Sequence, residues 1–233
     1  MKHTPQTKKE LQELVNDLSV NLGDIDTSKI TDMSYLFFDT QRTDFSGIEN
    51  WDVSKVEDME RMFKEAASFN ADISKWDVSN VENMECMFAE ATSFNADISK
   101  WNVGNVKDMT CMFDGATSFN QPIGEWDVSK VTNMGAMFYC AKAFNQDISG
   151  WDVSNVRDMA WMFRRAESFN QPIGDWDVSN VEDMACMFED AKSFNQDISS
   201  WDVSKVEDMG FMFYGAESFN QDISGWNNVR TMQ

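Results

Sequence analysis

The sequence is poor in the residues that most catalytic and metal sites need. It contains one histidine, His3, and four cysteines with no CxxC pair. A lone histidine removes the usual general base and any nucleophile that depends on it, and without a Cys/His cluster neither a zinc nor a redox site is expected. Phosphate-binding and hydrolase motifs such as GxGxxG, GxxxxGK[ST] and GxSxG are also missing. The sequence therefore predicts a protein that is not an enzyme and uses no metal and no cofactor.

Positive charge is scarce as well. The chain has 19 lysines and arginines against 40 acidic residues, a formal charge of -21. Phosphate backbones and anionic membranes would repel it, so we expect no nucleic-acid partner and no membrane insertion. No apolar run approaches the length of a membrane span, and the basic amino terminus is followed by no apolar stretch, so no export signal is expected. Hydrophobic residues nevertheless make up 42% of the chain, which indicates a folded globular protein.

What the sequence has in abundance is an internal repeat. Nine apolar residues and one asparagine are identical in all seven complete copies of 25 residues. A constant period of this size indicates stacked repeats. The shared residues of the first copy are Trp51, Val53, Val56, Met59, Met62, Phe63, Ala66, Phe69, Asn70 and Ile73, and the tryptophan recurs at Trp76, Trp101, Trp126, Trp151, Trp176, Trp201 and Trp226.

The repeat divides the chain into four parts. We predict a tail and capping helix over 1–24, with the helix at 7–18, then a degenerate first repeat over 25–50. Seven complete repeats fill 51–225, and a truncated repeat occupies 226–233. One extra residue before Trp51 predicts an irregular loop near 39–44. The truncated repeat leaves an apolar end, which suggests end-to-end self-association.

The spacing within each copy predicts one helix and one strand. Apolar residues from Val56 to Ala66 fall on one face of a helix over 55–66, and Ser54 with Glu57 resembles a capping box. The remaining segment favours a short strand over 70–74, although Pro122 would make that strand shorter or bulged, as would Pro172. The predicted fold class is α/β, a leucine-rich-repeat-like solenoid with parallel strands. It should curve with the strands on the concave side, because packed helices need about 8–10 Å and strands only about 4.8 Å.

The repeat units resemble those of a known family. NADISKWDVSNVENMECMFAEA and NQDISGWDVSNVRDMAWMFRRA, with the motif W-D-V-S-x-V-x-D-M-x-x-M-F, are similar to repeats of the BspA-type leucine-rich-repeat bacterial surface proteins. The resemblance covers about residues 25–232. It implies a leucine-rich-repeat-like fold and, by association, adhesion or partner binding at a cell surface, whereas the family's members are largely of unknown function.

The cysteines are expected to be free thiols. Cys86, Cys111 and Cys186 fall in one column of the predicted helices, and Cys140 falls in another. Adjacent helices would separate Cys86 from Cys111 by about 8–10 Å, beyond the roughly 7 Å limit for a disulfide.

Columns of aspartate are the first candidate binding site. Stacked carboxylates repel each other, so a divalent cation or a basic partner would stabilise them, whereas aspartate is also common in turns for structural reasons. One column would lie on the concave strand face, where such proteins bind extended partners, and the others follow the tryptophan or begin the helix. The strand column consists of Asp72, Asp97, Asp147, Asp197 and Asp222.

Two aromatic residues are the second candidate. Trp161 and Phe211 are large for a position that the repeat leaves variable. They are either exposed anchors on the convex side or partly buried between helices.

The predicted function is that of a non-enzymatic scaffold for protein–protein or adhesive interaction through an acidic concave face. The expected partner is a protein or another extended molecule, and the acidic face favours a basic one. The alternative is a calcium-stabilised or glycan-binding adhesion module. A third hypothesis, a hydrolase that uses carboxylates alone, needs two acids about 5–10 Å apart in a cleft, and the repeat pattern offers no obvious cleft.

Overall fold

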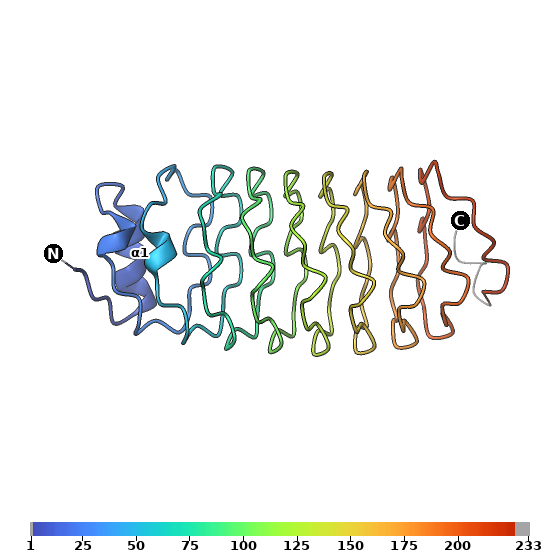
Figure 1. The fold of residues 1–233 in the computed structure, drawn as a ribbon, viewed down its shortest axis with the longest axis horizontal. Helices are drawn as coiled ribbons and strands as arrows, with labels where there is room; N and C mark the ends of the chain where they lie inside the picture. The colour runs from blue at the N-terminus through green and yellow to red at the C-terminus, as the bar shows by residue number, and fades with distance from the viewer. Residues whose placement is uncertain (1, 227–233) are drawn as a thin grey trace.

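The structure, a computed structural model, describes residues 2–226. Each repeat forms one coil of chain, and successive coils lie side by side along the long axis of the molecule (Figure 1). The described helices are α1, Lys8–Asn16, and two 3-10 helices, η1, Leu22–Asp24, and η2, Ile48–Asn50. In the described repeats the extended backbone pairs only through isolated parallel bridges, such as Asp58 with Asn83.

The predicted fold class, with one helix and one strand per repeat, is therefore wrong. Residues 55–66 contain no helix, and 70–74 form no strand. The bridges run instead through the column of Asp58, which the sequence placed at the start of a helix. Pro122 and Pro172 are tolerated because, in the described coils, no backbone N–H in their column donates to a neighbouring coil.

A ribbon of consecutive turns replaces the predicted helix. In the first copy the N–H groups of Met62 and Ala66 donate to the carbonyl three residues earlier, at 3.2 and 3.0 Å, while the alternate N–H groups of Arg61 and Phe63 donate to the next coil at 2.8 and 2.9 Å. The apolar spacing of three and four residues fits such turns as well as it fits a helix. In this copy every donor of the ribbon is thus used, half within the coil and half between coils.

The ribbon requires unusual backbone angles. The residue in the Arg61 column has a positive φ in every described coil, from 52° at Arg61 to 61° at Trp161. The column of Glu65 is also left-handed, and glycine occupies it at Gly115 and Gly215. Non-glycine residues are strained in this region, so the hydrogen bonds between coils hold the backbone in a conformation that it would not adopt alone.

Aspartates close the other turns. The carboxylate of Asp52 accepts from the N–H of Ser54 at 3.0 Å, and Asp58 accepts from Glu60 at 2.8 Å. Such bonds stabilise turns that aspartate side chains initiate. Ser54 and Glu57 therefore do not form a capping box.

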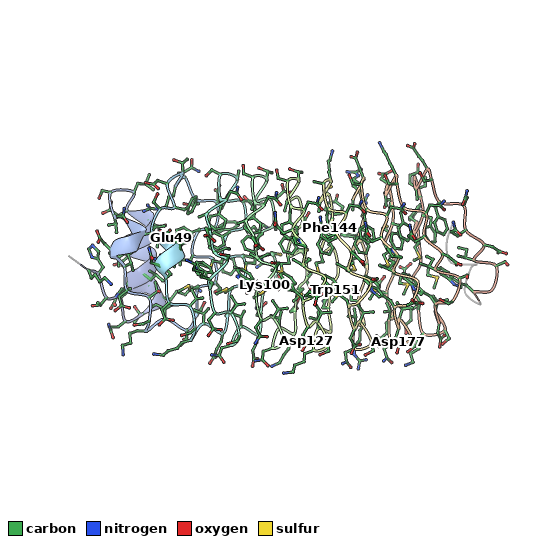
Figure 2. All side chains as sticks on the ribbon, in the orientation of Figure 1. Glu49, Lys100, Asp127, Phe144, Trp151 and Asp177 are labelled. Carbon is green, nitrogen blue, oxygen red and sulfur yellow. The ribbon has the colours of Figure 1, made fainter. Side chains whose placement is uncertain are left out.

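The core consists of side chains stacked in columns. Neighbouring tryptophan rings lie 6.5 Å apart and nearly parallel, as between Trp151 and Trp176, and Phe63 lies 5.6 Å from Phe88. Figure 2 shows Phe144 and Trp151 inside the stack and Asp127 and Asp177 at its edge. Spacings of this size leave no room for helices at about 8–10 Å. The predicted curvature is also wrong, because the described complete repeats contain no helices to widen one side, and the coils follow a straight axis in Figure 1.

The repeated asparagine links the coils through its side chain. The N–H of Asn95 donates to the Oδ1 of Asn70 at 2.8 Å, and the same bond joins Asn170 to Asn145 at 2.9 Å. The tryptophans also link neighbouring turns of the chain, since Nε1 of Trp126 donates at 3.1 Å to the main-chain carbonyl of Ile98, which lies just before Trp101 in the sequence. These bonds connect the coils at points where the backbone does not pair directly.

Helix α1 covers the first coil. Its N-cap Thr7 accepts from the N–H of Glu10, and Leu11 is fully buried. Arg42, in the segment where an irregular loop was expected, is buried and donates to the carbonyls of Val15 and Asp17 at 3.0 and 2.9 Å. A guanidinium satisfies the free carbonyls at a helix end and opposes the negative end of the helix dipole.

The division of the chain into four parts stays a prediction. From residue 227 on, the truncated repeat lies outside the described residues, and so does the expected contact between its apolar end and another molecule.

Candidate functional site

The five aspartates of the predicted binding column lie in one exposed row along the coils. Because the fold has no concave strand face, the row lies on an ordinary edge of the stack. Each carboxylate accepts from the backbone N–H of the serine two residues on, for instance Asp72 from Ser74 at 3.0 Å and Asp197 from Ser199 at 3.0 Å. The row is Asp72, Asp97, Asp147, Asp197 and Asp222.

These bonds keep the row ionised. The hydroxyl and N–H of Ser74 lower the pKa of Asp72, and the N–H and hydroxyl of Ser199 lower the pKa of Asp197. The row thus combines a structural role in its turns with a standing negative charge. Its part in partner binding stays a prediction.

No metal centre accompanies the aspartates. Across residues 2–226, no group of three or more histidine, cysteine, aspartate or glutamate side chains is arranged to hold a metal ion. The calcium-binding alternative therefore has no preformed ligand set in that part of the chain.

Trp161 and Phe211 lie on the outer side of the ribbon. Their exposed fractions are 47% and 53%. Being on a ribbon and not between helices, they project outward from a backbone with positive φ. The other possibility, partial burial between helices, is wrong because the coils that carry these residues contain no helix.

Small residues surround these two aromatics. We define the apolar stripe as the paired positions Thr110–Cys111, Gly135–Ala136, Ala160–Trp161, Ala185–Cys186 and Gly210–Phe211. Backbone hydrogen bonds hold successive pairs together, as from Ala136 N–H to the carbonyl of Ala160 at 2.7 Å. A shallow hollow of about 260 Å³ opens beside Trp161, over Thr110, Gly135 and Ala160.

The part that these small residues play in the surface was not predicted from the sequence. Their column carries glutamate in the first two copies, Glu60 and Glu85, and only threonine, alanine or glycine from Thr110 on. That change of side-chain size within one repeat position was the available signal. It became meaningful only when the ribbon placed this column next to that of Trp161.

Charged groups beside the stripe are paired. The Arg164 guanidinium lies 5.8 Å from the Trp161 ring and forms an ion pair with Glu189 at 2.8 Å. Arg165 pairs with Asp190 at 3.2 Å. The positive and negative charges around Trp161 therefore balance each other locally, whereas the molecule as a whole is acidic.

Comparison with known families identifies the repeat. The chain matches the profile of a family described as "Mycoplasma protein of unknown function, DUF285" over residues 8–122, 94–185 and 146–233. These overlapping matches extend from residue 8 to residue 233. The chain belongs to the DUF285 family. This membership is compatible with the resemblance to BspA-type repeats.

The other comparisons add no relative. No curated protein and no solved structure matches this DUF285 chain. Within residues 2–226, no helix has both the length and the apolar character needed to cross a membrane.

Proposed function

We propose that the chain is a non-enzymatic scaffold that binds a protein partner along the apolar stripe. The observation that carries this proposal is the exposure of Trp161 and Phe211, which lie outside the core while all other repeat tryptophans in the described coils are buried. Tryptophan is enriched among the residues that dominate binding energy at protein interfaces. The glycine and alanine positions between them let a partner approach the backbone closely.

The spacing of the two anchors suggests the shape of the partner. Trp161 and Phe211 lie two coils apart, on the order of 10 Å if coils are spaced like paired strands. On a peptide in the extended polyproline II conformation, side chains three residues apart lie on the same side and are separated by a similar distance, roughly 9 Å. We therefore propose an extended peptide segment with two apolar side chains at that separation.

Charge would act at longer range. The formal charge of -21 and the ionised aspartate row favour a basic partner through its rate of encounter, because steering depends on the whole field of the protein. The paired arginines beside the stripe would then contribute little to selectivity for charge. An adhesive role at a cell surface, which the BspA-type resemblance implies, belongs to the same proposal.

Selection from a random peptide display library on the immobilised protein tests this function. We expect enriched peptides to carry two apolar residues three positions apart and an excess of basic residues. Their affinity should fall at least tenfold in Trp161→Ser and in Phe211→Ser, about 1.4 kcal/mol or more. It should also weaken as salt concentration rises.

Phe38 provides the matched control. It is an exposed aromatic, 43% accessible, on the first coil and outside the stripe, so Phe38→Ser should leave peptide binding unchanged. Enriched peptides that bind all three variants equally would refute the stripe as the binding surface. An equal affinity at low and high salt would refute the electrostatic part, and binding of glycans but of no peptide would favour the alternative function.

A further inference from the structure

The ribbon brings Cys86 and Cys111 into direct register. The N–H of Cys86 donates to the carbonyl of Thr110 at 2.8 Å, and the N–H groups of Met84 and Phe88 donate to the same neighbouring coil at 3.1 and 2.9 Å. The two cysteines therefore occupy equivalent places in adjacent coils. Backbones paired in this way lie about 4.8 Å apart, within the roughly 4.4–6.8 Å between Cα atoms that a disulfide spans. The helix spacing that excluded a bridge does not exist.

Their side chains also share one direction. Both residues have φ of 54°, so both sulfurs leave the backbone on the outer side of the ribbon. The Cys111 side chain is close enough to interact with the Cys86 thiol, which donates to Oε1 of Glu85 at 3.8 Å. Cys86 is 7% exposed, whereas Cys111 is half-buried and lines the hollow beside Trp161. A small solute therefore has a short path to the pair.

The surroundings of the pair separate the two thiols chemically. The hydrogen bond with Cys111, followed by the Arg61 guanidinium, lowers the pKa of Cys86 in spite of burial and the nearby Glu85. The same contact, together with burial, raises the pKa of Cys111. Cys86 is thus the more acidic thiol of the pair and Cys111 the less acidic one.

We propose that Cys86 and Cys111 form a redox-sensitive pair that closes to a disulfide across two neighbouring coils, with a peroxide as oxidant. The Cys86 thiolate attacks one oxygen of hydrogen peroxide, the O–O bond breaks, and Cys86 sulfenic acid and hydroxide are formed. The Cys111 sulfur then attacks the Cys86 sulfur, the S–O bond breaks, and water leaves with the Cys111 proton. The two cysteines lose two electrons, and the peroxide is reduced to two molecules of water once the hydroxide takes up a proton.

The remaining cysteines serve as internal controls. In its own column Cys140 lies between Gly115 and Arg165, and Cys186 is likewise without a cysteine in the adjacent coils. Neither has a partner with which to close a bridge in this fold. The cross-link should therefore be confined to the coils of Cys86 and Cys111.

Thiol counting on the folded full chain tests the proposal. All four thiols are free in the reduced protein. After treatment with hydrogen peroxide we expect two, and dithiothreitol should restore four. Peptide mapping should show Cys86 joined to Cys111 with the loss of two hydrogen atoms. The melting midpoint should rise by roughly 5–10 °C on oxidation.

Two variants distinguish disulfide formation within the pair from general oxidation of single cysteines. In Cys111→Ser, Cys86 should stop at the sulfenic acid, trapped by dimedone, and oxidation should no longer raise the midpoint. Cys186→Ser should still form the bridge. The proposal is overturned if the wild-type protein keeps four thiols under peroxide that fully oxidises glutathione. It is also overturned if peptide mapping of the oxidised wild-type protein finds a different disulfide pairing. This measurement does not depend on the folding of any variant.

Discussion

At the scale of single residues, hydrogen bonding decides what each carboxylate contributes. Asp127 accepts from the hydroxyl and N–H of Ser129 at 2.6 and 3.1 Å, and these bonds lower its pKa. Asp114 is half-buried, its Oδ1 has no hydrogen-bond partner, and burial together with Glu90 raises its pKa to about 6. At neutral pH the charge of Asp127 therefore stabilises the fold, whereas the charge of Asp114 opposes it.

We expect Asp114→Asn to stabilise the protein at pH 8 and to have little effect near pH 4. The folded pKa of about 6 lies above the ordinary value of 3.8, so the favourable contribution of neutral Asp114 is complete below about 3.8 and is lost as the pH rises through 6. Solvent screening of a half-buried group reduces the effect to about 1–2 kcal/mol. Urea unfolding of the variant and the wild type at both pH values measures the difference.

Asp127→Asn is the matched control with the opposite sign. Because the pKa of Asp127 is lowered in the folded protein, its stabilising contribution is present above 3.8 and is lost as the pH falls through the folded pKa. The substitution should therefore destabilise at pH 8. If both variants respond to pH in the same direction, the assigned environments of the two carboxylates are wrong.

The roles of single residues were only partly predictable. The repeat marked Asn70 as important, but its side chain bonds the backbone of Asn95, which lies 25 positions away. Nothing local in the sequence identifies such a partner. The structural role of the turn aspartates was easier to predict, because Asp-x-Ser is a turn signal that involves only neighbouring residues.

At the scale of the element, the ribbon of turns and the predicted helix share the same apolar spacing. A helix and a series of turns both place side chains three or four residues apart on one side. What separates them is the positive φ at Arg61 and Glu65, and neither side chain signals it. The deciding interaction is the bond from each ribbon to an identical neighbour, which a local pattern does not contain.

The strained backbone predicts an unusual effect of glycine. Ala136 has φ of 53°, a conformation that costs non-glycine residues about 1–2 kcal/mol. Ala136→Gly should therefore stabilise the protein by about 0.5–1 kcal/mol after the entropy of glycine in the unfolded chain is subtracted. Thermal or urea unfolding measures the change.

Ala160, from the adjacent column of the same ribbon, is the control. Its φ is not positive, so Ala160→Gly should destabilise by about 0.5–1 kcal/mol. Destabilisation by both substitutions to a similar extent would contradict the strain assigned to Ala136.

At the scale of the whole molecule, register between coils governs stability. Each coil donates to the next through the ribbon and to the previous one through the asparagine, so a coil is stable only between matching neighbours. The repeat and the stacking of its tryptophans were visible in the sequence. The path of the chain within a coil, and therefore the place of the apolar stripe, was not.

Removing one coil tests this dependence. Deletion of residues 126–150 joins Glu125 to Trp151 and keeps every column aligned, so the shortened chain should fold cooperatively with a somewhat lower melting midpoint. Deletion of residues 126–138 removes about half a coil and places ribbon positions against tryptophan positions. That chain should not fold, as circular dichroism and tryptophan fluorescence would show, and equal stability of the two deletions would contradict the register.

The ribbon also makes the molecule electrically polar along its length. In an ordinary sheet the peptide dipoles largely cancel. In the first copy the N–H groups of Met59, Arg61, Phe63 and Glu65 donate to the later coil, whereas that of Glu57 donates to the earlier one. The peptide dipoles of the ribbon therefore leave a net component along the long axis. Two such molecules lying side by side would have the lower electrostatic energy when they run in opposite directions.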